Sequence, residues 1–121
     1  MRQKLVAGNW KLNGSKASIE TLMQGILAGM APLDKVAVAV CPPYVYIPLT
    51  QSLLTGSSVA LGSQDVADQT AGAYTGEVSA VMLKEFGCTY AIVGHSERRA
   101  LYAEQDNDTA RKFAAARKQG L

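Results

Sequence analysis

The sequence of 121 residues is poor in the side chains that hold metal ions. It contains a single histidine, His95, and two cysteines, Cys41 and Cys88, which do not stand at the spacing of metal ligands. One histidine cannot complete a Cys/His zinc site, so the sequence predicts no bound metal. Both cysteines adjoin apolar runs, and we expect two buried thiols in a reducing compartment rather than a disulfide.

A strong excess of charge of one sign is also missing. The formal net charge is +2, which is too small to indicate a nucleic-acid or membrane partner, because such partners select a basic patch. Basic residues do gather near the C-terminus, at helical spacing beside alanines, and we expect them on a solvated helix face. They are Arg111, Lys112, Arg117 and Lys118.

Long hydrophobic runs are absent as well. No apolar run is long enough to cross a membrane, and the N-terminal segment MRQKLVAGNWK lacks the apolar core of a signal peptide. Hydrophobic residues nevertheless make up 48% of the chain and charged residues 18%, which is typical of a globular protein. We therefore expect a soluble cytoplasmic protein with enough chain for a buried core.

Four short apolar runs recur along the chain and predict buried strands. They are apolar on both faces and mostly rich in β-branched residues, as in a sheet that is covered on both sides. The expected strands are residues 5–10, 36–41, 59–64 and 90–95.

Helical patterns fill the intervals between these runs. The helices are expected between Ser15 and Pro32, between Pro48 and Gly56, between Ser79 and Gly87, and between Asp106 and Gly120. In the third helix, Val81, Met82 and Phe86 form the expected inner face. In the fourth, the apolar side includes Phe113.

This alternation of strand and helix predicts a parallel α/β sheet with right-handed crossovers. A closed (β/α)8 barrel takes about 250 residues, so four units would make about half of one. A small doubly wound sheet also fits, although that fold normally needs five strands. The pattern alone leaves both architectures open.

The unusual polar residues stand where the expected strands end. Asn9 and Lys11 close the first strand, while His95, Ser96 and Glu97 close the fourth. In parallel α/β folds the carboxyl ends of the strands converge on one face, where sites are usually built. A lysine aimed into a cleft there would supply a fixed positive charge for an anionic substrate or a developing oxyanion.

Each of these residues also has a purely structural interpretation. Lys11 could face water, because the asparagine–glycine pair that follows it is a strong turn signal. His95 could be a hydrogen-bonded structural group, and Glu97 could be a carboxylate favoured at a helix N-terminus. If a helix begins directly after His95, the dipole of that helix opposes a positive charge and keeps the imidazole a neutral donor.

Four segments resemble the signature segments of the triosephosphate isomerase family, in the order and spacing of the family. They are AGNWKLNG, LGSQDV, GAYTGEVSAVML and YAIVGHSERR. The resemblance implies the barrel and not the doubly wound sheet. The fold would be α/β, of the TIM (β/α)8 barrel family, here an incomplete half-barrel of four βα units with parallel strands. Residues 1–121 would form a single incomplete domain, the N-terminal half of the barrel.

The same resemblance implies roles for five residues. Asn9 matches the asparagine that hydrogen-bonds the substrate, and Lys11 matches the lysine that holds the phosphorylated triose and stabilises the enediolate. His95 matches the histidine that donates a hydrogen bond, and then a proton, to the substrate oxygens. Glu97 matches the carboxylate that interacts with the lysine and with the neighbouring subunit, and Ser96 has a supporting role.

The segment 69–77 resembles the loop that enters the partner subunit in this family. Thr75 matches the residue at its tip, and Thr75 and Gly76 are the expected residues of a homodimer interface. One departure is Gly14, where many relatives carry an interface cysteine, so the details of the interface could differ here.

The resemblance implies a glycolytic isomerase that interconverts dihydroxyacetone phosphate and D-glyceraldehyde 3-phosphate through an enediolate, without a cofactor. The general-base glutamate and the phosphate-binding loops of the family have no counterpart in these 121 residues. We therefore expect the chain alone to be inactive, and to associate with itself or with a complementary C-terminal half. The alternative is a non-catalytic, self-assembling half-barrel module.

Overall fold

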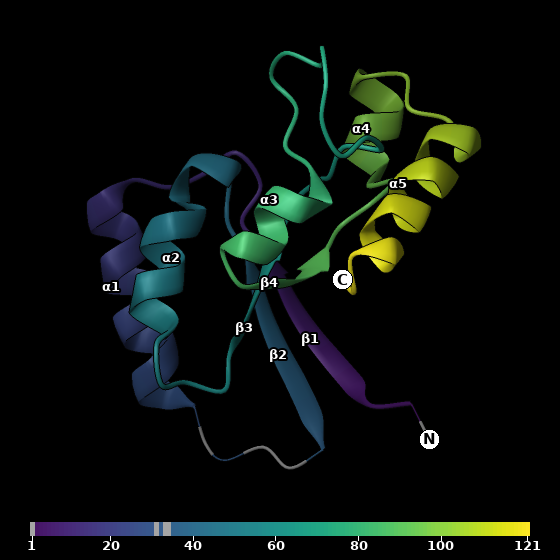
Figure 1. Ribbon diagram of the computed structural model, residues 1–121. Helices are drawn as coiled ribbons and strands as arrows, with labels where there is room; N and C mark the ends of the chain where they lie inside the picture. The colour runs from purple at the N-terminus through teal and green to yellow at the C-terminus, as the bar shows by residue number, and fades with distance from the viewer. Residues whose placement is uncertain (1, 31, 33–34) are drawn as a thin grey trace.

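The computed structural model describes residues 2–30, 32 and 35–121, which form one parallel sheet flanked by helices (Figure 1). The strands are β1 (Lys4–Asn9), β2 (Val36–Cys41), β3 (Ala60–Ser63) and β4 (Cys88–Ala91). The helices are α1 (Lys16–Gly29), the 3-10 helix η1 (Tyr44–Tyr46), α2 (Ile47–Leu54), α3 (Ala80–Glu85), α4 (Ser96–Leu101) and α5 (Asp106–Lys118). Strand and helix alternate as the sequence predicts.

The strand order decides between the two architectures that the pattern left open. The order in the sheet is β1-β2-β3-β4, and each neighbouring pair is parallel. A doubly wound sheet contains a switch point at which the order reverses. An open sheet that follows the chain order without reversal is instead the arrangement of a partial TIM barrel, and it agrees with the expected fold class.

The fourth strand lies earlier in the chain than expected. The sequence predicts it at 90–95, whereas the strand begins at Cys88 and ends at Ala91. Ile92 still donates its N–H to the Ser63 carbonyl at 2.9 Å, and Gly94 then takes a φ of +64°. This left-handed turn ends the extended backbone, a change of direction that an apolar run cannot reveal.

The first helix begins as the sequence predicts. The Ser15 hydroxyl accepts the N–H of Ser18 at 3.1 Å, and the Ser18 hydroxyl accepts the N–H of Ser15 at 2.8 Å. This reciprocal pair satisfies two backbone donors at the start of α1. Ile19 and Met23 are buried on its inner face, whereas Leu22 is 44% exposed.

The inner face of α3 differs from the one that the sequence predicts. Ser79 caps the helix as expected, with its hydroxyl accepting the Met82 N–H at 3.2 Å. However, Val81, Met82 and Phe86 are exposed, and the buried positions are Ala80 and Leu83. A helix of six residues is too short for its apolar pattern to fix which side faces the core.

The buried face of α5 also differs from the predicted one. Phe113 is 57% exposed, whereas Lys112 is only 8% exposed and Ala116 is buried beside it. The expectation that Lys112 belongs to a solvated basic face is therefore wrong. This lysine can be buried because carboxylates surround its ammonium group, as described below.

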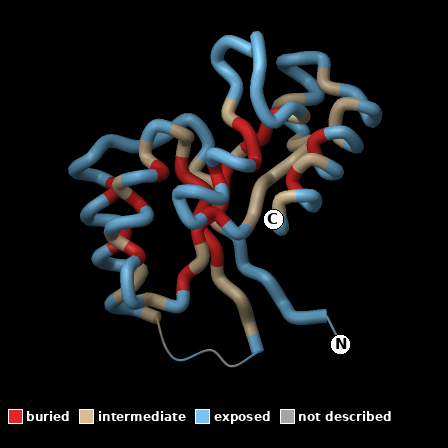
Figure 2. The backbone as a smooth tube through the Cα atoms, viewed as in Figure 1, coloured by how far each residue is buried: buried red, intermediate tan, exposed pale blue. Residues whose placement is uncertain are grey.

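The core lies where α1, α2 and α3 cover β2, β3 and β4, and the outer strand β1 is left open (Figure 2). Its central members include Ile19, Val40 and Leu61. By contrast, Leu5 and Val6 on β1 are 46% and 60% exposed. The sheet therefore presents an apolar edge strand to solvent, a surface suited to further strand pairing.

Candidate active site

The carboxyl ends of the strands surround an open hollow of about 660 Å³. Polar side chains from three strand ends line it, which is where sites lie in parallel α/β folds. These side chains are Asn9 and Lys11 after β1, Gln64 and Asp65 after β3, and His95 and Glu97 after β4. Four of the five residues expected at the site therefore share one hollow.

Lys11 has a left-handed backbone, with a φ of 56°. This conformation costs a non-glycine residue about 1–2 kcal/mol. Two side chains bond its peptide groups: Asn9 Oδ1 accepts the Lys11 N–H at 3.0 Å, and Gln64 Nε2 donates to the Lys11 carbonyl at 2.8 Å. Backbone strain of this kind persists where the surrounding contacts hold the strained conformation in place, and it is common at functional sites.

The ammonium group of Lys11 pairs with Glu97 across the hollow. Lys11 Nζ lies 2.7 Å from Glu97 Oε1, and both side chains are about half exposed. The hydrogen bond from Lys11 is the main cause that lowers the pKa of Glu97, and it outweighs the opposing effect of desolvation. The carboxylate is therefore ionised at neutral pH and holds the lysine at the rim.

The geometry of His95 fixes its hydrogen-bonding state. The residue is the N-cap of α4, and its Nδ1 accepts the backbone N–H of Glu97 at 3.1 Å. A ring nitrogen that accepts a hydrogen bond carries no proton, so a neutral ring bears its proton on Nε2. With Nδ1 engaged in this way, Nε2 is the ring nitrogen left to donate a hydrogen bond to another partner.

The remaining expected residues differ in their surroundings. The Asn9 Oδ1 is already used by the Lys11 N–H, so the amide nitrogen of Asn9 is the group left for another partner. Ser96 is the first residue of α4, is exposed, and does not line the hollow. Any support that Ser96 gives would therefore act through α4.

A cluster of four charged residues lies next to the hollow, and the sequence did not reveal it. Arg98 contacts both Asp65 and Glu104, and Lys112 Nζ lies 2.9 Å from Asp65 Oδ1 and 3.1 Å from Glu104 Oε2. Burial alone would raise the pKa of Glu104, but hydrogen bonds from Arg98 and Lys112 outweigh burial and lower it. The cluster ties α4 and α5 to the end of β3.

Thr109 of α5 packs beneath the turn that precedes His95. It lies so close to Gly94 that a Cβ on this glycine would be 2.6 Å from Thr109 Cγ2. The Thr109 hydroxyl oxygen is buried and has no hydrogen-bond partner among the described residues. This contact combines close packing with an unsatisfied polar atom.

We expect Thr109→Val to raise the free energy of unfolding by about 1 kcal/mol, because a methyl group replaces a buried hydroxyl without a partner. Urea unfolding at one fixed protein concentration would measure the change. The same substitution at Thr21, which is exposed on α1, controls for helix propensity and should have little effect. Equal effects at the two positions would contradict the expectation.

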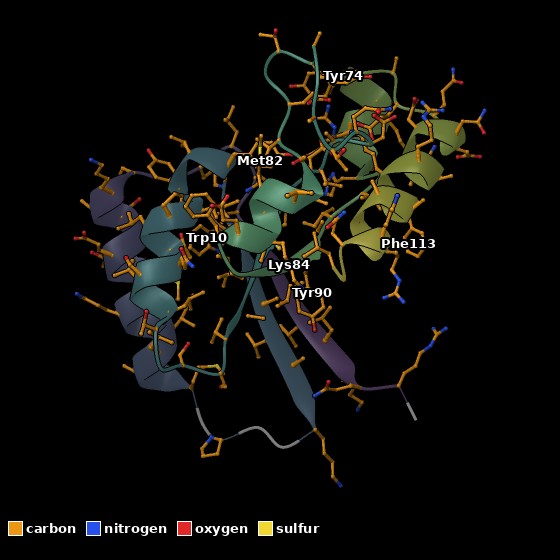
Figure 3. All side chains as sticks on the ribbon, in the orientation of Figure 1. Trp10, Tyr74, Met82, Lys84, Tyr90 and Phe113 are labelled. Atoms are coloured by element: carbon orange, nitrogen blue, oxygen red, sulfur yellow. The ribbon has the colours of Figure 1, made fainter. Side chains whose placement is uncertain are left out.

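The segment between β3 and α3 projects beyond the body of the molecule, and Tyr74 lies in this loop (Figures 1 and 3). Thr75 and Gly76 form its turn, both are exposed, and Gly76 has a φ of +90° that suits glycine. Gly76 and Glu77 also reach the rim of the hollow. The two residues expected at a subunit interface are therefore accessible.

Comparison with known proteins agrees with this geometry. A family model described as triosephosphate isomerase matches residues 4–121. The chain belongs to the triosephosphate isomerase family. Proteins named triosephosphate isomerase from Dechloromonas aromatica and Hydrogenovibrio crunogenus are 54% and 52% identical to it over its whole length. The one from Methylococcus capsulatus is 53% identical over 96% of the chain.

The chain spans about half the length of the curated triosephosphate isomerases that it matches. The matched region covers 48% of the Dechloromonas and Hydrogenovibrio proteins and 46% of the Methylococcus protein. The four βα units described here correspond to this part of the family.

Two features do not occur in the described part of the chain. Within residues 2–30, 32 and 35–121, no three histidine, cysteine or acidic side chains cluster as metal ligands would. Among the same residues, no helix combines the length and hydrophobicity needed to cross a membrane.

Proposed function

We propose that this chain supplies one part of a triosephosphate isomerase active site. The whole protein would interconvert dihydroxyacetone phosphate and D-glyceraldehyde 3-phosphate through an enediolate, in the cytoplasm and without a cofactor. The observation that carries the proposal is the joint arrangement of Lys11 and His95. The ammonium group of Lys11 and the imidazole of His95, from opposite edges of the sheet, line one hollow.

The proposed roles follow from the chemistry of each side chain. The charge of Lys11 attracts the phosphorylated triose and stabilises negative charge on the enediolate oxygen. His95 donates its Nε2–H to the substrate oxygens, and Asn9 offers its amide N–H groups to the same substrate. Glu97 holds Lys11 in position, while Ser96 supports the start of α4.

We further propose that residues 1–121 do not turn over substrate alone. The reaction requires a base for the proton on the substrate carbon, and such a base is worth roughly 10²–10⁴-fold. Glu97 is engaged with Lys11, so this role falls to the part of the family outside the matched region. The 121 residues would then be half of one barrel domain that needs a complementary half or self-association.

Assembly is proposed to follow the family resemblance, with the exposed Thr75 and Gly76 at the interface of a homodimer. A non-catalytic self-assembling half-barrel is less favoured. A module released from catalysis would have no need to hold Lys11 in a strained backbone conformation beside a neutral histidine.

A chimera tests the proposed function. Residues 1–121 replace the part of the Dechloromonas aromatica isomerase that they match, and both the chimera and the 121-residue chain are purified from a host without its own isomerase. We expect the chimera to be active and to sediment as a dimer, and the 121-residue chain to show no turnover. A folded but inactive chimera would contradict the proposed function, and turnover by the 121-residue chain would contradict its dependence on a second half.

A further inference from the structure

We propose that Gln64 is a positioning residue, which holds Lys11 in its left-handed backbone conformation and thereby keeps the lysine ammonium group at the hollow. The effect on catalysis rests on the proposed function, whereas the link between Gln64 and the Lys11–Glu97 pair does not. Gln64 follows β3 and reaches back to the ends of the two preceding strands.

The side-chain amide of Gln64 bridges two strand ends. Its Nε2 donates to the Lys11 carbonyl at 2.8 Å and to the Cys41 carbonyl at 2.9 Å, so both amide hydrogens are used. The Cys41 carbonyl also accepts the N–H of Trp10 at 3.1 Å. Gln64 therefore ties the segment that carries Lys11 to the fixed end of β2.

The two bonds on the Lys11 peptide act together. Asn9 Oδ1 accepts the backbone N–H of Lys11, and Gln64 Nε2 donates to the backbone carbonyl of the same residue. If the second bond is lost, the Lys11 backbone can relax from a φ of 56° into the region that non-glycine residues prefer. That rotation redirects the side chain and removes Nζ from the 2.7 Å contact with Glu97.

Few other side chains could fill this role. A glutamate at position 64 has the same shape but cannot donate when it is ionised, and a methionine has the same length without any donor. An asparagine is one methylene shorter and could not reach both carbonyls. The geometry therefore selects a long side chain with two N–H groups on one atom.

Titration of Glu97 in the 121-residue chain tests the structural link without any activity. The ionisable groups next to this carboxylate are Lys11 and His95, and the hydrogen bond from Lys11 is the main cause of its lowered pKa. Carbon-13 NMR should show that Gln64→Met returns the pKa of Glu97 toward its ordinary value. The matched change Gln24→Met, at an exposed position on α1, should leave the pKa of Glu97 lowered. An unchanged pKa of Glu97 in Gln64→Met would overturn the proposal.

Kinetics of the chimera test the consequence for catalysis. We expect Gln64→Met to lower kcat/KM by about ten- to a hundredfold, as displacement of a catalytic group does. In a Lys11→Met background the same change should have almost no further effect, because Gln64 acts through Lys11. Equal losses in both backgrounds would mean a general structural role and overturn the proposal. An inactive unaltered chimera would refute the proposed function, and the Glu97 titration would still decide the role of Gln64.

Two further measurements cover the case in which Gln64→Met does not fold. Gln64→Glu keeps the size and polarity of the side chain, and it should also return the pKa of Glu97 toward its ordinary value. In the unaltered chain, the side-chain amide protons of Gln64 should exchange with solvent at least about tenfold more slowly than those of Gln24. Equal exchange rates would show that the two bonds are not maintained, and the proposal would fail.

Discussion

Lys11→Met should lower kcat/KM of the chimera by about 10²–10³-fold, the loss that follows removal of one group that stabilises a developing oxyanion. Methionine is unbranched like lysine, and the change removes the ammonium group with its charge and its hydrogen-bond donors. The ammonium group pairs with Glu97 at the rim of the hollow, so its loss takes the fixed positive charge from the site. Steady-state kinetics in both directions of the reaction would measure the effect.

The control for this variant is Lys16→Met. Lys16 is exposed at the first position of α1 and does not line the hollow. Its replacement removes the same charge at a distance from the site and should leave kcat/KM nearly unchanged. If Lys11→Met and Lys16→Met behave alike, the proposed role of Lys11 is wrong.

Lys112→Met should lower the free energy of unfolding by about 3 kcal/mol, because it leaves buried carboxylates without one of their partners. Lys112 Nζ lies near both Asp65 and Glu104, and these carboxylates would retain only Arg98. Urea unfolding at neutral pH would measure the change. Lys118→Met, at an exposed position on the same helix, should cost far less.

The pH dependence gives a second, independent check on this cluster. The pKa of Glu104 in the folded chain lies below its ordinary value of 4.5. Its contribution to stability is therefore fully present above that value and is lost as the pH falls through the folded pKa. The difference between Lys112→Met and the unaltered chain should shrink over this acid range. A difference that stays constant would show that Lys112 acts through packing and not through Glu104.

The parts of the fold that depend on local rules could be predicted from the sequence. The bounds of β2 and the Ser15 cap of α1 are as expected, because an apolar run and a capping residue act within a few positions. The inner faces of α3 and α5 could not be predicted, because they depend on what packs against each helix. A periodic pattern treats Lys112 as exposed, and only the positions of Asp65 and Glu104 make its burial possible.

The candidate site shows the same difference between residues that could be predicted from the sequence and residues that could not. Lys11 and His95 could be recognised because they follow apolar strands, where parallel sheets gather polar residues. Gln64 follows a strand too, but its importance lies in bonds to residues 53 and 23 positions away. Likewise, nothing local to Thr109 indicates that it packs against Gly94. Such relations exist only after the strands have been brought into register.

The strand order, in which each strand lies beside its successor, has a consequence for how the chain folds. The paired residues are 32, 21 and 27 positions apart in the three interfaces, as for Lys4 with Val36, Ala39 with Ala60 and Leu61 with Cys88. Each pairing therefore closes only the loop of a single βα unit, and the entropy of closure is similar at every step. During synthesis, which exposes the N-terminus first, the sheet can grow one unit at a time. The edge of the hollow that carries Lys11 then forms in the first of these folding steps, and the edge that carries His95 forms in the last.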